Sequence, residues 1–261
     1  KEKPLKMCWF AMPGWKQPAF LSSLDQPLKG RIVSREIPAA DPKNAKRPVD
    51  VYLPPSYEAS DARYPVVYIQ DGRGARTLGR IEKVADAIFS TGGKKREAIM
   101  VFLQDTSNPM ARTADPSQVI AEQVVPFIDK TYRTVADRSG RVSYGTGFNC
   151  ATALALAASQ SELFSAVSAQ SPLVFDEGQA QLIGLFEKLD RPLRVYIEWG
   201  SFDMHNPHEN WDIRTIGKNL ADGIAKNKKL TVTSRQVNDS TDWRSWSSGL
   251  DKVLEFLLAA E

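Results

Sequence analysis

From residue 66 to the end of the chain, short apolar runs alternate with segments that repeat apolar residues at the helical period. Residues 66–70 and 98–103 are almost wholly apolar, which is typical of strands buried on both faces of a parallel sheet. Residues 118–132 instead place apolar side chains along one face of a helix. Such an alternation, with no long low-complexity linker, predicts an α/β fold with one mostly parallel sheet and helices on both faces.

The other expected elements follow the same pattern. Further strands are expected at residues 31–37, 49–53, 141–144, 164–169, 193–199 and 230–237, and further helices at 78–89, 151–160, 179–188, 211–226 and 244–260. The first two strands are expected to form an antiparallel edge of the sheet.

The first 29 residues differ in composition from the rest of the chain. They are rich in Pro, Lys and large apolar groups, and their aromatic rings need a surface to cover them. We therefore expect an irregular N-terminal arm, residues 1–29, that lies on a single α/β domain, residues 30–261.

The charge and hydropathy of the chain exclude two classes of function. The net charge of +3 and the pI near 8.8 come from scattered Lys and Arg residues, far from the basic patch of a nucleic-acid-binding protein. No apolar run approaches the roughly 18 residues that a membrane-spanning helix needs. We expect neither a nucleic-acid partner nor a membrane span.

A sharp turn is expected at residues 145–149, where the sequence GTGFN lies between a short strand and an alanine-rich helix. In α/β-hydrolases this turn carries the pattern G-x-S-x-G, and its serine attacks the substrate carbonyl. Here the serine position is Gly147. A glycine has no side-chain atom that can attack a carbonyl, so the turn predicts a hydrolase frame without its nucleophile.

Five segments, taken in order, resemble one family of α/β-hydrolases. They are VDVYLPPSY at 49–57, YPVVYIQDG at 64–72, EQVVPFIDKTYR at 122–133, the turn region 138–154, and DWRSW at 242–246. Over residues 30–260 the chain is similar to the esterase D-like or enterochelin-esterase-like hydrolases, a group that includes feruloyl and acetylxylan esterases. The resemblance implies an α/β-hydrolase fold and no cofactor.

The family works by a relay of serine, acid and histidine, in that chain order. The resemblance places the serine on Gly147, the acid on Asp203 and the histidine on Thr241. Only the orienting acid remains at these three positions. A lone carboxylate does not perform acyl transfer without a nucleophile and a base, so the resemblance implies a degenerate triad.

Four other residues are weighed as replacements for the missing groups. Ser143 lies inside an expected strand, where its side chain should pack in the sheet. Cys150 opens the helix after the turn, but no histidine is placed to activate it. The only two histidines, His205 and His208, follow Asp203 and could replace the base or bind a divalent metal with it. The spacing D-x-H-x-x-H matches no established metal pattern, and no metal is expected.

The residues expected around the mouth of the site are candidates for binding a ligand. In the family, the loop after the strand at 66–70 and the residue after the nucleophile supply the N–H groups of an oxyanion hole. Arginines in and near that loop could add an anion-binding corner or could point to water. The candidate ligand-binding residues are Gly72, Arg73, Arg76, Arg112, Phe148, Asp203, His205 and Trp243.

Two further expectations concern the cellular compartment of the protein and the state of its cysteines. The chain begins at Lys1 rather than Met and the resembling esterases are often exported, so we expect a periplasmic or secreted protein. Its two cysteines, Cys8 and Cys150, allow at most one internal disulfide. The sequence leaves open whether they pair, and two buried free thiols are expected.

The leading hypothesis is a pseudoenzyme, an esterase-like domain that binds a carbohydrate, an acyl ester or an anionic group without turning it over, or that serves as a scaffold for a protein partner. One alternative is an active carboxylic-ester hydrolase whose relocated site uses Asp203 with His205 or His208. A further alternative is a structural module of a larger secreted protein, in which the arm packs against a neighbouring domain.

Overall fold

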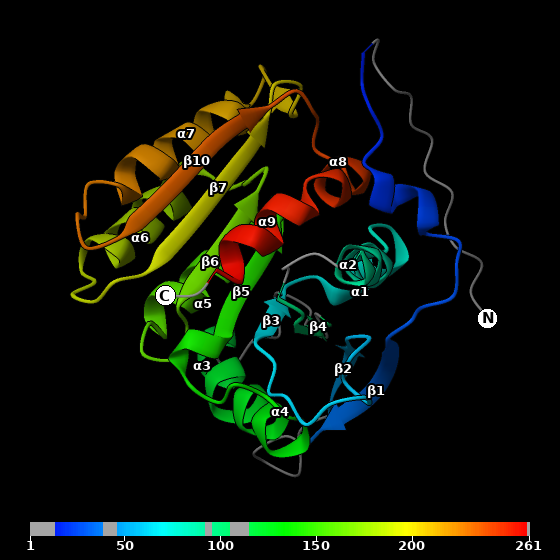
Figure 1. Ribbon diagram of the computed structural model, residues 1–261. Helices are drawn as coiled ribbons and strands as arrows, with labels where there is room; N and C mark the ends of the chain where they lie inside the picture. The colour runs from blue at the N-terminus through cyan, green and yellow to red at the C-terminus, as the bar shows by residue number, and fades with distance from the viewer. Residues whose placement is uncertain (1–13, 39–45, 92–95, 105–114, 260–261) are drawn as a thin grey trace.

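The computed structural model describes residues 14–38, 46–91, 96–104 and 115–259. Its centre is an eight-stranded sheet of order β1-β2-β4-β3-β5-β6-β7-β10 (Figure 1). The strands are β1 (Arg31–Ile37), β2 (Arg47–Leu53), β3 (Val66–Ile69), β4 (Ile99–Leu103), β5 (Arg141–Thr146), β6 (Ala166–Gln170), β7 (Arg194–Gly200) and β10 (Thr231–Val237).

The pairing directions confirm the predicted fold class. Parallel pairing runs through six strands in the order β4, β3, β5, β6, β7 and β10. Strand β2 pairs antiparallel with both β1 and β4, so the first two strands form the antiparallel edge that the sequence predicts. The carboxyl ends of the parallel strands therefore meet along one edge of the sheet, where ligands bind in open α/β sheets.

Helices cover both faces of this sheet (Figure 1). One face carries α3 (Pro116–Val119), η3 (Ile120–Val124), α4 (Val125–Thr131), α5 (Cys150–Ser159), α6 (Asp176–Glu187) and α7 (Ile213–Ile224). The other carries η1 (Ala19–Ser23), α1 (Gly72–Thr77), α2 (Ile81–Ser90), α8 (Trp243–Ser248) and α9 (Leu250–Leu257). Within the described ranges, no helix combines the length and the apolarity needed to cross a membrane.

The region after β3 differs from its prediction. The segment expected to be a loop at 71–76 is helical from Gly72 and forms α1, whereas the helix expected at 78–89 is observed as α2 and begins at Ile81. They separate at Arg80, whose φ of +50° is left-handed and cannot continue a right-handed helix.

The last third of the chain holds two further differences. The helix expected at 244–260 is broken at Gly249 into α8 and α9. A short hairpin of β8 (His205–Asn206) and β9 (Trp211–Asp212) lies within the segment between β7 and α7, and no periodic pattern in the sequence indicated it.

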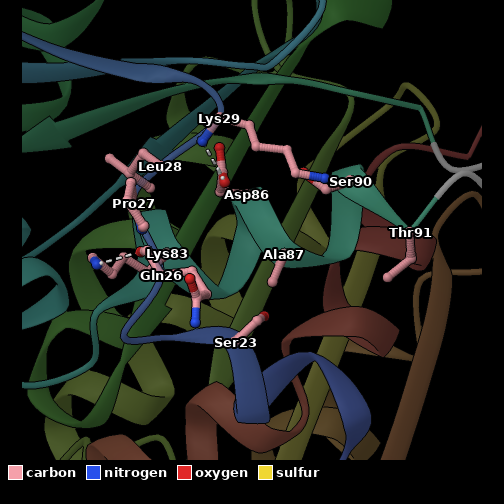
Figure 2. Close-up of a pocket in the computed structure, with 10 residues that line it drawn as sticks. All are labelled: Ser23, Gln26, Pro27, Leu28, Lys29, Lys83, Asp86, Ala87, Ser90 and Thr91. Atoms are coloured by element: carbon pink, nitrogen blue, oxygen red, sulfur yellow. Dashed lines mark hydrogen bonds between the residues drawn. The ribbon is translucent and has the colours of Figure 1, made fainter.

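The described part of the arm, residues 14–29, packs against α2. Leu21 and Leu24 are buried in the same apolar cluster as α2. At the end of the arm, the Asp86 carboxylate accepts hydrogen bonds from the backbone N–H of Lys29 at 2.9 Å and of Gly30 at 2.7 Å. Figure 2 shows this anchor beside a crevice between the arm and α2. The division of the chain at residues 29 and 30 stays a prediction.

Candidate functional site

The turn after β5 has the backbone of a nucleophile elbow. Gly147 follows the strand directly and has a φ of +54°, a left-handed conformation that is strained for residues with a side chain. A Cβ on Gly145 would lie 2.6 Å from the carbonyl oxygen of Asn149. The strand and the helix α5 therefore meet at a contact that only glycine permits, and the turn is as sharp as the sequence predicts.

The ring of Trp246 covers the bare position of this elbow. A Cβ built on Gly147 would lie 3.4 Å from the Cη2 atom of Trp246, its nearest neighbour. Trp246 is buried, and its indole N–H donates to the hydroxyl of Ser171 at 3.0 Å. The first atom of a side chain on residue 147 would thus make an ordinary van der Waals contact with this apolar ring.

Asp203, the expected acid, is buried behind the same ring, with its carboxylate fully engaged. One oxygen accepts from the hydroxyls of Ser171 at 3.0 Å and Thr241 at 2.8 Å, and the other accepts from the backbone N–H of Gly200 at 2.8 Å. Burial raises the pKa of Asp203 above its ordinary range, and these three hydrogen bonds oppose the shift. The carboxylate is held by neutral donors rather than by an imidazole.

Thr241 occupies the place that the resemblance assigns to the histidine. Its hydroxyl donates to Asp203 and accepts from the backbone N–H of Met204 at 3.1 Å. A hydroxyl does not take up a proton near neutral pH as imidazole does. Thr241 therefore keeps the structural link to the acid but cannot act as general base.

Two residues of this network, Ser171 and Trp246, were missed by the sequence reasoning. Ser171 follows β6 with a left-handed φ of +50°, and nothing in the local sequence marks it. Trp246 belongs to the DWRSW segment, so its nearness to the turn could have been suspected from the resemblance. Together they form a chain of hydrogen bonds from Trp246 through Ser171 to Asp203.

Comparison with known proteins assigns the chain to a family. A family model described as "Putative esterase" matches residues 42–257. The chain belongs to this esterase family. The uncharacterized protein YjcH of Bacillus subtilis strain 168 is 25% identical over 225 residues, which cover 80% of this chain and 90% of YjcH.

Solved structures similar to this family member share its fold. A ferulic acid esterase superposes with a TM-score of 0.71 at 21% identity, over 89% of this chain and 98% of that one. A mutant of the feruloyl esterase module from Clostridium thermocellum, complexed with sinapinate, gives a TM-score of 0.73 at 14% identity, over 98% and 97% of the two chains. Identities this low show the fold alone, and they confirm the α/β-hydrolase architecture.

The arginines expected at the mouth have different surroundings in this esterase-family chain. Arg76 forms an ion pair with the buried Asp50, which also accepts from Ser34 at 2.5 Å. Arg73 is exposed on α1. Arg112 lies outside the described residues. The role of all three in binding an anion stays a prediction, with Arg76 already neutralised by Asp50.

The start of α1, where the family places oxyanion donors, is tightly closed. A Cβ on Gly72 would lie 2.6 Å from the carbonyl carbon of Phe102. The side chain of Asp71 accepts from the backbone N–H of Gly74 at 3.0 Å. Trp243, expected as a ligand contact, is buried and stacks edge-to-face on Trp246, with ring centroids 5.0 Å apart. It presents no open ring face at the mouth.

The two histidines do not join Asp203 in a cluster. His205 and His208 are exposed in and beside the β8–β9 hairpin, whereas Asp203 is buried. Among the described residues, no three His, Cys, Asp or Glu side chains gather in an arrangement that could hold a metal ion.

The remaining nucleophile candidates are buried. Cys150 is a free thiol whose Sγ lies 3.3 Å from the carbonyl oxygen of Gln170, and burial raises its pKa well above the ordinary value. Ser143 is fully buried within β5. Neither side chain can reach a substrate. Cys8 lies outside the described residues, so its pairing stays open.

A set of exposed apolar side chains lies instead along the carboxyl edge of the sheet. Phe148 follows β5, Phe175 lies beyond β6, and Phe202 and Met204 follow β7, and all four are roughly half-exposed or more. These three strands are adjacent in the sheet. Exposed apolar residues of this kind are candidates for an interaction surface where they are contiguous.

Proposed function

We propose that this chain is a non-catalytic member of the esterase family that binds a ligand at the carboxyl edge of its sheet. The observation that carries the proposal is the bare elbow: Gly147 occupies the nucleophile position with a left-handed φ of +54°, and the nearest neighbour of a side chain built there is the Trp246 ring, at 3.4 Å. Membership of the esterase family and the fold are observed, and the absence of catalysis is what we propose.

The relay needs both a nucleophile and a general base. Removal of the nucleophile alone lowers the rate of such relays by a factor on the order of a million. Here the base is also missing, because the Thr241 hydroxyl replaces an imidazole at Asp203. The Asp203 carboxylate accepts from Ser171, Thr241 and the backbone N–H of Gly200, so the carboxylate serves as a structural acceptor.

The exposed edge supports binding rather than loss of all function. Side chains such as Phe148 and Phe202 cost solubility when exposed, and a ligand or partner that covers them offsets that cost. The feruloyl esterase module of similar fold is complexed with sinapinate. An acyl ester or a carbohydrate at this edge is therefore the proposed ligand class, in keeping with an esterase ancestor. A partner protein on the same edge would fit a scaffold role.

A turnover assay tests the proposal. The chain is incubated with p-nitrophenyl acetate and with feruloyl and acetyl sugar esters, with and without EDTA, and product release is followed over hours. We expect rates equal to those of the heat-denatured chain. Turnover that Asp203→Asn abolishes would overturn the proposal, because it would place hydrolysis at this site. Asp203→Asn is the necessary control for a contaminating esterase, whose activity it would leave unchanged.

The same assay decides the relocated active site. Turnover that is lost in the double variant His205→Ala/His208→Ala would show that one of these histidines acts as base. Sensitivity to EDTA would add a metal. The separation of the exposed histidines from the buried Asp203 gives this alternative no support, and we expect the double variant to behave as the parent chain does.

A further inference from the structure

A groove lies between the start of α6 and the segment that runs from the β8–β9 hairpin into α7. Its volume is about 310 Å³, which suits one or two small rings. Helices α6 and α7 lie side by side at this end of the molecule (Figure 1). Its lining includes two aromatic rings, three carboxylates and the polar side chains of Gln179, Thr215 and Asn219.

Two aromatic rings form one wall of this groove. Phe175 and Trp211 meet edge-to-face, with centroids 6.4 Å apart and planes at 76°. Phe175 is 54% exposed although it is a large apolar residue. The indole N–H of Trp211 donates to the Glu209 carboxylate at 2.8 Å, which fixes the ring. The wall is therefore present without a ligand.

Polar groups that both donate and accept line the rest of the groove. Asn219, Gln179 and Thr215 carry amide and hydroxyl groups, each able to donate and to accept hydrogen bonds. Gln179 is buried and is oriented by a hydrogen bond to Asp176 at 3.2 Å. Asn219 makes no side-chain hydrogen bond with any described residue and is free to meet a ligand.

The charged groups of the groove argue against an anionic ligand. No Lys or Arg is among the described residues that line it, which disfavours phosphate and carboxylate groups. Each of its three carboxylates already has a donor: Asp212 is paired with Arg214 at 2.6 Å, Glu209 accepts from the indole at 2.8 Å, and Asp176 accepts from Gln179 at 3.2 Å. The rings meet edge-to-face as a single wall, not as a cage of ring faces around a cation.

We propose that this groove binds a neutral sugar, with the ring C–H face of the sugar against Phe175 and Trp211 and its hydroxyls on Gln179, Thr215 and Asn219. Sugar hydroxyls need donors and acceptors together, which amides supply, and apolar C–H faces need an aromatic surface. The groove is linked to the bare elbow, since the backbone N–H of Leu173, two residues before Phe175, donates to the carbonyl oxygen of Gly147 at 3.1 Å. The inference rests on the proposed function, because it names a glycan as what the chain holds without cleaving it.

Calorimetric titration with three neutral hexasaccharides tests the inference. Cellohexaose, xylohexaose and maltohexaose are each added to the intact chain up to about 10 mM, a range that detects millimolar affinities. We expect at least one to bind. Phe175→Ala should then weaken the affinity about five- to tenfold, the size of one aromatic contact, and Asn219→Ala should weaken it as well.

A matched control separates the groove from a general loss of surface. Leu185 also lies on α6, is exposed, and does not line the groove, so Leu185→Ala should leave sugar binding unchanged. Because Phe175 and Asn219 are exposed, their variants should fold as the parent does, which circular dichroism checks.

Each outcome of these titrations decides the inference. Failure of all three hexasaccharides to bind, or binding that Phe175→Ala and Asn219→Ala leave unchanged, would overturn it. Binding of tetramethylammonium in place of the sugars would overturn it in favour of a cation site. The turnover assay is a separate test. Hydrolysis would contradict the proposed function but would not contradict sugar binding in the groove. Absence of both sugar binding and turnover would contradict only the proposed groove ligand.

Discussion

The bare elbow and the neighbouring groove are two regions at the same edge of one sheet, and they have opposite characters. At the elbow, buried groups hold one another: Trp246 donates to Ser171, and Ser171 and Thr241 donate to Asp203. At the groove, Phe175 and Asn219 remain exposed. The difference shows that buried, hydrogen-bonded side chains and exposed side chains lie next to one another at one edge of this sheet. Side-chain changes at the elbow should act on stability, and changes at the groove should act on binding.

The largest expected effect concerns Trp246. Trp246→Ala should lower the free energy of unfolding by about 3–5 kcal/mol, as large-to-small changes of a buried aromatic do, and it leaves the Ser171 hydroxyl without its donor. Urea denaturation followed by circular dichroism measures the change. A loss under about 1 kcal/mol, the range of surface changes, would show that the elbow is not packed as described and would erase the contrast between the regions.

A smaller effect is expected from placing a side chain on the elbow. Gly147→Ser should cost about 1–3 kcal/mol because it forces a non-glycine residue into a left-handed φ, and its side chain would face the Trp246 ring. Gly147→Ala is the matched control, since it adds the same strain without a hydroxyl. Both variants should lack esterase activity in the p-nitrophenyl acetate assay. Activity in the serine variant alone would reveal a hidden base, most directly His205.

A pH dependence follows from the raised pKa of Asp203. Because its folded pKa lies above the ordinary value of 3.8, the folded state holds this proton more tightly than the unfolded state does. Asp203 therefore favours folding most below that value, and this contribution is lost as the pH rises through the folded pKa. The Asp203→Asn variant carries no titrating group at this position. Relative to the parent chain, its free energy of unfolding should therefore be higher at pH 7 than at pH 4.

Urea unfolding of both proteins at the two pH values measures this difference. Asp239 also has a raised pKa, caused chiefly by burial, and its charge is one of the causes that raise the pKa of Asp203. If the difference in free energy of unfolding between parent and variant is the same at both pH values, the raised pKa of Asp203 is contradicted.

The smallest expected effect on stability lies at the groove. Phe175→Ala should change the free energy of unfolding by no more than about 0.5 kcal/mol, as surface substitutions do, because more than half of the side chain is exposed. The same urea experiment measures it beside Trp246→Ala. A loss near that of Trp246→Ala would show that Phe175 is a structural residue, and the contrast between the two regions would then fail.

The order and type of the main elements could be predicted because each carries its own periodicity. The buried runs at β3 and β4 and the glycine-flanked turn at Gly147 are local signals, and each was placed within a few residues of its observed position. The break at Arg80 was not predictable in this way, since a left-handed arginine has no sequence signature. The β8–β9 hairpin is too short to show an alternating pattern.

The candidate site was predictable only in part, for a related physical reason. Family resemblance located Gly147, Asp203 and Thr241 along the chain, but the contact between Trp246 and Gly147 joins residues far apart in sequence. Arg76 was a candidate for either a ligand contact or a solvent-exposed position, and its pairing with Asp50 joins α1 to β2, two elements whose contact local sequence patterns cannot report. The groove at Phe175 draws on elements after β6 and before α7, which no single motif connects.

The indole over Gly147 also sets the terms on which this lineage could regain chemistry. A serine at 147 would be strained and would face a ring, a histidine at 241 would have no hydroxyl to activate, and removal of the ring alone would leave a buried void. If the chain is non-catalytic as proposed, a working relay would therefore require changes at positions 147, 241 and 246 together.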